Sequence, residues 1–339
     1  AAGAFAFVPL VSALPLFVLC TSTLLICMAV WRTPVVALVA DVTPSPLRSQ
    51  ASAVVSFMGG VGAIIAYFGG GALAKLDAAY PFWLGSGVVI VAAALLFAFV
   101  REPKTYASEG LEVDDKQPGF VASLREIFAD SDKSALCLLL ALFCLMVGYT
   151  AVEGFFSLYA LQHLGLRAAD SSRLLGLASL SFLVFALPSG SLGARWGRRA
   201  TVMLGLMGMA ALLLVLFFLP AATLIQPLIS LPVLSTIPLV GAILMLIGLC
   251  YALVIIHPIA MLSDMTDNSR LGTYTGLYYL FLSLAAIAGP ILNAGVIELS
   301  GKNYNTVMLF APVMLALAWV LMWGVKRGES VASAPPEVQ

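Results

Sequence analysis

The sequence predicts an all-α integral membrane protein built from two related helical bundles. The chain is 61% hydrophobic and only 10% charged, with a mean hydropathy of +1.04, whereas a soluble domain carries about 25% charged residues. The apolar residues gather in segments long enough to cross a bilayer, which needs about 20 residues per helix. An apolar segment that ends in Asp-X-Thr, with an Arg shortly after it, occurs at Asp41 and again at Asp264. A weak internal repeat in a membrane chain is typical of transporters made of two bundles.

Nine segments have the length of a membrane-spanning helix, and hydrocarbon requires each to satisfy its own backbone hydrogen bonds. They cover residues 14–40, 49–74, 81–100, 135–160, 172–194, 200–219, 238–262, 272–297 and 304–325. Residues 1–10 resemble the end of a further span, and the chain opens on Ala1 within an apolar run. We therefore expect that the first bundle is incomplete at its start, by about two to three helices.

The distribution of Lys and Arg predicts how the chain is oriented. When the loop at 42–48 is placed in the cytoplasm, most of the 17 basic residues fall in cytoplasmic loops, as the positive-inside rule requires. The C-terminus is then cytoplasmic. The formal net charge of zero hides this asymmetry between the two sides, and it does not indicate nucleic-acid binding. We expect a multi-pass, monomeric protein of the cell membrane whose partners are the lipid bilayer, a small-molecule substrate and protons.

A polar stretch divides the chain into two halves. Residues 1–100 are the remainder of an N-terminal helix bundle, 101–133 form a cytoplasmic central loop, and 134–327 form a C-terminal six-helix bundle. The tail at 328–339 has the composition of a disordered segment. Segment 220–237 is apolar but interrupted by prolines, so we expect an irregular outer connection that lies against the membrane surface.

Several chemistries have no signal in the sequence. The chain shows no nucleotide-binding Gly-rich loop, no nucleophile triad and no metal-ligand spacing. The five cysteines fall within spans, where they are expected to be free thiols that pack as small apolar groups. The sequence therefore predicts a protein that is not an enzyme and that has no cofactor and no metal site.

Residues 190–199, GSLGARWGRR, follow the pattern Gly, four residues, then Arg-X-Gly-Arg-Arg. The segment resembles the cytoplasmic signature of the major facilitator superfamily, although Ala194 stands where that family usually has Asp. The resemblance implies the major facilitator fold, with two six-helix bundles that rock around a substrate site near the membrane midplane.

A narrower resemblance points to sugar transport. Residues 31–43, WRTPVVALVADVT, resemble a helix of the sucrose/proton symporters, and 148–159, GYTAVEGFFSLY, resemble bacterial relatives in the glycoside-pentoside-hexuronide group. The resemblance implies import of a sugar, such as a disaccharide, by proton symport with alternating access. Two alternatives stay open: efflux of amphipathic compounds by proton antiport, and a non-transporting membrane sensor or inactive fragment.

Three titratable residues are candidates for substrate and proton coupling: Arg32, Glu153 and His257. A charge deep in a span is costly and is kept only with a partner or a water-filled cavity, although Arg32 could also form a static salt bridge between helices. Glu153 sits among apolar residues that favour its protonated form, so it could exchange a proton near neutral pH. A simple hydrogen-bonded Glu is the alternative, and His257 could be a packing residue.

Further polar and aromatic residues complete the predicted site. The substrate cavity is expected to include Trp31, Tyr149, Phe156, Ser157, Tyr274, Tyr278 and Asn293. The cytoplasmic gate is expected to include Asp41, Arg48, Arg195, Arg198, Arg199, Asp264 and Arg270. In this gate the two aspartates cap helices or pair with Arg48 and Arg270.

Overall fold

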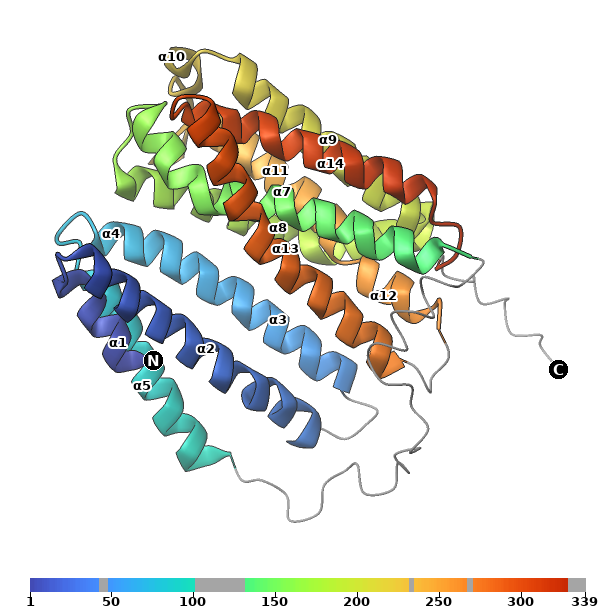
Figure 1. Ribbon diagram of the computed structural model, residues 1–339, viewed down its shortest axis with the longest axis horizontal. Coiled ribbons are helices and arrows are strands. Elements are labelled where there is room, and N and C mark those ends of the chain that lie inside the picture. The colour runs from blue at the N-terminus through green and yellow to red at the C-terminus, as the bar shows by residue number, and fades with distance from the viewer. Residues whose placement is uncertain (43–47, 101–131, 232–234, 267–270, 329–339) are drawn as a thin grey trace. The chain divides into compact units, whose positions relative to one another are not determined.

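The computed structural model describes residues 1–42, 48–100, 132–231, 235–266 and 271–328. The chain folds into two compact units, Ala1–Asp115 and Lys116–Gln339, and almost all of the described elements are helices (Figure 1). The boundary falls within the predicted central loop, most of which lies outside the described residues. The division into two bundles and a tail otherwise stays a prediction.

The N-terminal unit is made of helices joined by short turns. In chain order they are α1 (Ala2–Phe7), α2 (Leu14–Val42), α3 (Arg48–Ile64), a π-helical segment (Ile65–Gly70), α4 (Gly71–Leu73) and α5 (Tyr80–Phe99). Helix α1 packs on α5: the Ser86 hydroxyl donates to the carbonyl of Ala2 at 2.9 Å, and the Phe5 and Phe82 rings meet edge to face. The first residues of the chain are therefore part of the packed unit.

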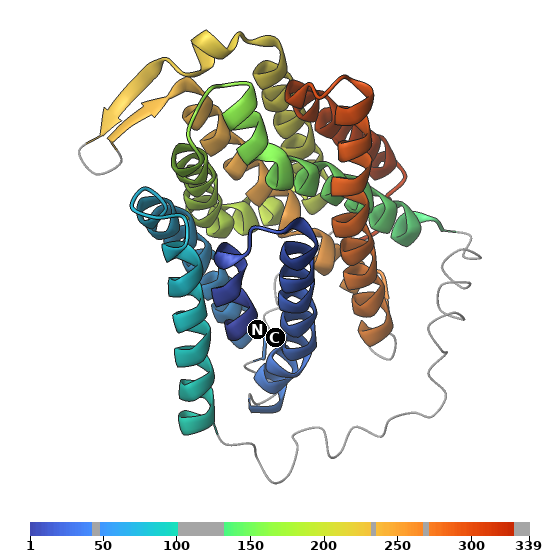
Figure 2. The ribbon, with the colours of Figure 1, turned by 60° about the vertical axis from the view of Figure 1, so that its left-hand side comes forward.

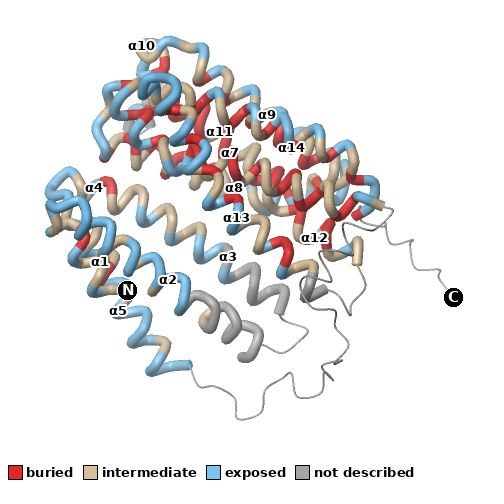
Figure 3. Tube along the Cα trace, in the orientation of Figure 1, coloured by how far each residue is buried: buried red, intermediate tan, exposed pale blue. Residues whose placement is uncertain are grey.

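The C-terminal unit holds the larger number of long helices. They are α7 (Ser134–Gln162), α8 (Ala168–Trp196), α9 (Arg198–Phe218), α10 (Ala221–Leu224), α11 (Leu239–Ile255), α12 (Pro258–Ser263), α13 (Leu271–Leu299) and α14 (Val307–Trp323). Within this unit α8 packs on α11, α9 packs on α11 and α14, and α7 packs on α13 and α14. Figure 3 shows the buried residues concentrated along these contacts.

Eight of the described helices are long and apolar enough to cross a membrane. They coincide with eight of the nine predicted spans, for example Tyr80–Phe99 against a prediction of 81–100. The ninth, 49–74, corresponds to α3, the π-helical segment and α4, of which Phe57–Leu73 is a shorter apolar helix. The chain is an all-α, multi-pass membrane protein.

Small residues let the helices of the C-terminal unit approach closely. A Cβ on Gly205 of α9 would lie 2.8 Å from the carbonyl oxygen of Cys250 in α11. A Cβ on Gly289 of α13 would lie 2.7 Å from the carbonyl oxygen of Val147 in α7. Helices in lipid gain stability from such close backbone packing, since no hydrophobic effect drives them together there.

Two predictions about the region around α11 are corrected by the structure. The segment expected to be irregular contains α10 and an antiparallel hairpin of β1 (Pro227–Leu231) and β2 (Ser235–Pro238), seen at one end of the bundle in Figure 2. Pro227 and Pro238 face each other at the open end of the ladder, where a missing N–H costs little.

The predicted span 238–262 matches one candidate span, Leu239–Ser263, but it is not one continuous helix. Helix α11 ends at Ile255, and α12 begins at Pro258. A proline has no N–H to donate and its ring clashes with the preceding turn, so it fits best at the first position of a helix, where Pro258 stands. His257 is the residue that caps α12 and stands in the break.

Candidate functional site

Two tyrosines from different helices form a stack in the C-terminal unit. The rings of Tyr149 on α7 and Tyr251 on α11 lie nearly parallel, with centroids 4.1 Å apart and an interplanar angle of 6°. Their side chains are also hydrogen-bonded to each other. The ring of Phe182 on α8 packs against Tyr251 with centroids 5.4 Å apart. Three helices therefore meet at Tyr251.

Glu153 belongs to the same cluster. It lies one helical turn after Tyr149 on α7, so the two side chains share a face of that helix. The carboxylate of Glu153 interacts electrostatically with Tyr251, as does the hydroxyl of Tyr278 on α13. Glu153 itself is exposed. We call Tyr149, Glu153, Phe182, Tyr251 and Tyr278 the aromatic-carboxylate cluster.

Three members of this cluster are residues that the sequence predicts for the site: Tyr149, Glu153 and Tyr278. Tyr149 and Glu153 share a face of α7, and Glu153 and Tyr278 each interact electrostatically with Tyr251. Tyr251 and Phe182 were not predicted, although Tyr251 stands at the centre of the ring contacts. The signal for Tyr251 was weak, because it is one aromatic residue in an apolar segment that offers no periodicity to indicate its direction.

Two of the residues predicted to line the cavity are enclosed. Phe156 is fully buried and its ring tilts against Tyr159, with centroids 5.9 Å apart. Asn293 on α13 is also fully buried, and neither atom of its amide has a hydrogen-bond partner among the described residues. Both residues lie in packed interior here, so their contact with substrate stays a prediction.

The remaining predicted cavity residues have local contacts. The hydroxyl of Ser157 is exposed and lies 3.4 Å from that of Ser171. Tyr274 on α13 is half-buried. Trp31 on α2 is exposed, and its indole N–H contacts the sulfur of Met28 at 3.0 Å.

His257 lies apart from the cluster. It is buried in the break between α11 and α12, and its Nε2 lies 3.3 Å from the hydroxyl of Ser189 on α8. Ser189 donates to the carbonyl of Ala252 at 2.8 Å. The ring also packs against Gly193, where a Cβ would collide with it. Tyr251 precedes His257 by six residues, and α11 ends between them at Ile255.

Two of the predicted gate residues form an ion pair at the start of α9. The guanidinium of Arg198 pairs with the carboxylate of Asp264, which directly follows α12. The sequence predicts a different role for Asp264, either helix capping or pairing with Arg270. Because Arg198 is the first residue of α9, Asp264 also lies near the positive end of that helix, which favours a carboxylate.

The neighbouring arginine holds the end of α14. Arg199 donates from Nε to the carbonyl of Met322 at 3.1 Å and from Nη2 to the carbonyl of Trp323 at 3.0 Å. These carbonyls belong to the last turn of the helix, whose acceptors have no intrahelical partner. Arg195 is exposed at the end of α8.

The end of the described chain is fastened to the start of α7. Arg327 pairs with Asp132, and the backbone N–H of Lys326 donates to the Ser134 hydroxyl at 3.0 Å. Ser134 in turn donates to Asp132 from its hydroxyl at 2.6 Å and from its backbone N–H at 2.9 Å. These bonds from Ser134, followed by the charge of Arg327, hold the pKa of Asp132 below its ordinary value.

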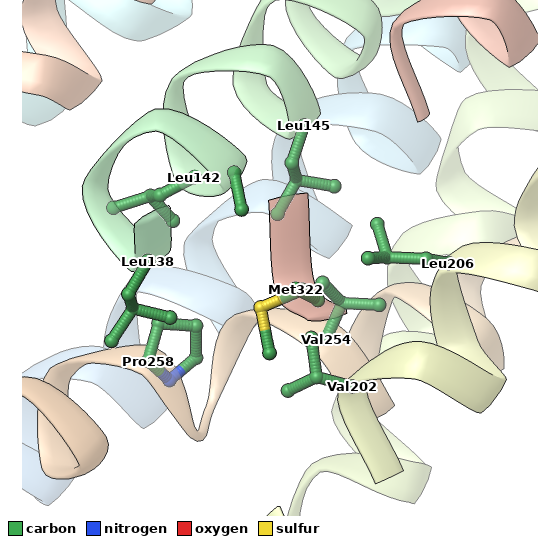
Figure 4. A pocket seen from close by; sticks show the side chains of 9 residues that line it. Leu138, Leu142, Leu145, Val202, Leu206, Val254, Pro258 and Met322 are labelled. Atoms are coloured by element: carbon green, nitrogen blue, oxygen red, sulfur yellow. The ribbon is translucent and has the colours of Figure 1, made fainter. Parts of the chain in front are cut away.

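A small apolar cavity lies elsewhere in the same unit (Figure 4). Its walls come from α7, α9, α11, α12 and α14, and it has room for little more than a water molecule. The lining residues are Leu138, Ala141, Leu142, Leu145, Val202, Leu206, Val254, Pro258 and Met322. It contains none of the predicted site residues and no polar side chain that could orient a ligand.

Some predicted residues lie outside what the structure describes. The side chains of Arg32, Asp41, Arg48 and Arg270 belong to this group, as do residues 101–131 and 329–339. Their proposed roles stay predictions. Within the described ranges, no group of three or more His, Cys, Asp or Glu side chains could hold a metal ion.

Comparisons with known proteins agree with the architecture. A sequence model of the Major Facilitator Superfamily matches residues 1–234 and again 138–338. The chain is 25% identical over 307 residues to multidrug resistance protein 2 of Bacillus subtilis strain 168, covering 88% of this chain and 70% of that protein. It is similar in structure to a bacterial homologue of the human lysosomal transporter Spinster, solved in an inward-facing and occupied conformation. That match has a TM-score of 0.69 and 15% identity, and it covers 95% of this chain and 79% of the other.

Proposed function

Since this chain belongs to the major facilitator superfamily of membrane transporters, we propose that it exports amphipathic organic compounds, cationic ones foremost, in exchange for protons. Glu153 is the group that holds either the proton or the substrate. The observation that carries this proposal is the placement of Glu153 one helical turn after Tyr149, whose ring stacks on Tyr251, together with the electrostatic interaction between Glu153 and Tyr251.

The aromatic-carboxylate cluster suits an organic cation for two reasons. Aromatic faces attract a cation within about 6 Å, with about 0.5–2 kcal/mol per contact depending on desolvation. A carboxylate adds the opposite charge, and Glu153 is the one acidic residue in the middle of a span of the C-terminal unit. Flat apolar substrates also gain by packing on exposed aromatic surface.

The same geometry links substrate movement to proton movement. A protonated Glu153 is neutral and loses its attraction for a cation, whereas an ionised Glu153 binds one. Proton and substrate therefore compete for one carboxyl group, so each displaces the other when the site opens alternately to the two sides. The 25% identical relative from Bacillus subtilis, named as a multidrug resistance protein, supports this substrate class.

Proton-coupled sugar import is the second candidate. The segment 31–43 that resembles sucrose/proton symporters favours it, and so do the hydroxyls of Tyr149 and Tyr278 and the exposed Ser157. Aromatic faces can pack on sugar C–H groups while hydroxyls bond the sugar. This mechanism requires Arg32 for coupling, whereas export of cations does not.

The two candidates are separated by transport in proteoliposomes that contain the full-length protein. An imposed pH gradient drives movement of tetraphenylphosphonium or of labelled sucrose, while an entrapped pH dye follows protons. We expect tetraphenylphosphonium to move against the proton flux and sucrose to show no response. Glu153→Gln should abolish the coupled proton signal, whereas Glu298→Gln, at the far end of α13, should leave it intact.

Three results would oppose the proposal. Proton-driven sucrose uptake without tetraphenylphosphonium transport would replace it with the sugar symporter. Coupled exchange that survives in Glu153→Gln would move the proton to another group. If neither substrate moves although the protein is monodisperse and folded, the result would favour the non-transporting alternative.

A further inference from the structure

The connection between α9 and α11 carries no charge. No Asp, Glu, Lys or Arg occurs anywhere in residues 200–263, which include α9 after its first two residues, α10, the β1–β2 hairpin and α11. A connection that projects into water normally has polar and charged residues. Its composition therefore indicates an environment other than bulk water.

Helix α9 has one face that is exposed and apolar. Leu204, Met207, Val215 and Phe218 follow one another at helical spacing, and Phe218, its last residue, is 74% exposed. The opposite face packs into the bundle through Leu206, Met209, Leu213 and Leu216. In a membrane-spanning helix such an exposed apolar stripe faces lipid.

The exposed apolar surface continues past the end of α9 into the connection. Ile225 directly follows α10 and is 42% exposed, and Leu228 on β1 is 56% exposed. Leu228 stands at the irregularity in the ladder, between the pairs Pro227–Pro238 and Ile229–Ile237. A bulged residue leaves the regular pairing and can point away from the sheet.

The other side of the hairpin packs against the helix bundle. The exposure of Ile225 and Leu228 is therefore not that of a loose loop. Ile237 on β2 is 2% exposed and contacts Gly241 at the start of α11. Arg173 on α8 donates to the carbonyl of Thr236 at 2.8 Å. The N–H of Leu239 donates to the carbonyl of Gln226 at 3.0 Å and closes the base of the hairpin.

We propose that the β1–β2 hairpin is an interfacial anchor, which lies in the headgroup–acyl boundary of the leaflet at the end of the bundle opposite Arg198. The side chains of Ile225 and Leu228 enter the upper acyl region. A two-stranded sheet has unpaired backbone groups at its edges, so it cannot enter the hydrocarbon itself. The interface satisfies both the polar backbone and the apolar side chains.

The anchor has a consequence for α11. This helix begins one residue after β2 and carries Tyr251 of the aromatic-carboxylate cluster. Lipid contact at the hairpin fixes the depth of one end of α11, while the hydrogen bond from Arg173 to Thr236 ties that end to α8. The inference does not depend on which substrate is carried.

Spin labelling in liposomes tests the depth of the hairpin. The five cysteines are first replaced by Ala, and single cysteines are introduced as Leu228→Cys, Ile225→Cys and Lys302→Cys. Lys302 is the control, since it is exposed in a polar turn at the same end of the unit. Each nitroxide is then tested for collision with oxygen, which concentrates in lipid, and with a water-soluble nickel chelate.

We expect labels at 228 and 225 to collide more with oxygen than with nickel, and the label at 302 to show the reverse. Two other results would overturn the anchor. A nickel preference at 228 and 225 equal to that at 302 would place the hairpin in water. Protection from both reagents would place it against protein. The label at 225 can also be combined with Leu228→Asp. If its preference for oxygen is lost in that variant, insertion through Leu228 is further supported.

Discussion

The rings of Tyr149 and Tyr251 lie nearly parallel with centroids 4.1 Å apart and join α7 to α11, one helical turn from Glu153 on α7. Among the ring contacts of the described residues, this is the one that joins α7 to α11. The pair is therefore both a contact between helices and the surface that the proposed substrate meets.

Two replacements of Tyr251 distinguish the contribution of its ring to substrate affinity from that of its hydroxyl. Tyr251→Ala removes the stack with Tyr149 and the contact with Phe182, so affinity for tetraphenylphosphonium should fall about tenfold, which corresponds to about 1.4 kcal/mol. Tyr251→Phe keeps the ring and should stay within about threefold of the parent. Equilibrium binding measures both, with Tyr304→Ala as the control. Equal affinity in Tyr251→Ala would remove the stack from the binding site.

The contact between α9 and α11 should tolerate no side chain at Gly205. A Cβ there would lie 2.6 Å from Cγ2 of Val254 and 2.8 Å from the carbonyl oxygen of Cys250. Such overpacking costs about 1–3 kcal/mol. Gly205→Ala should therefore lower the melting temperature in detergent, whereas Gly295→Ala, with open space around it, should keep or raise it. Identical melting temperatures would mean that the two helices move apart freely.

The sequence predicted the helices well but not the contacts among them. Apolar length alone located spans such as 80–99 and 198–218, because hydrocarbon thickness sets helix length. Helix α7 is apolar on every side, so its pattern could not show that Tyr149 faces α11. That direction depends on which helices pack together.

The same limit applies to the pairing of charges. The sequence predicts that Asp264 caps a helix or pairs with Arg48 or Arg270, but its described partner is Arg198, 66 residues away. The break before Pro258, which the sequence did not predict, places Asp264 near the start of α9. Pairing across a bundle follows from helix order and not from local sequence.

The ion pair between Arg198 and Asp264 should contribute little to stability. Their side chains are 21% and 47% exposed, and solvent screening limits such pairs to about 0–1 kcal/mol. A double-mutant cycle with Arg198→Gln and Asp264→Asn should give a coupling energy in that range, decreasing with added salt. The more exposed pair of Arg167 and Asp170 should couple less. A salt-insensitive coupling well above that range would indicate a buried network.

Acidic pH should weaken the attachment of Lys326 and Arg327 to the start of α7. The pKa of Asp132 is lowered first by the Ser134 hydroxyl, then by the Ser134 N–H and by Arg327. A carboxyl with a lowered folded-state pKa stabilises the protein fully above its ordinary value of 3.8, and that contribution is lost as the pH falls through the lowered value. The difference in melting temperature between the parent and Asp132→Asn should therefore be constant from pH 7 to 5 and shrink only below about pH 4. Ser134→Ala removes the largest cause and brings the folded-state pKa closer to 3.8, so the difference should be smaller in that variant and its loss should be complete at a higher pH. A difference that disappears between pH 7 and 6 would assign the effect to another group.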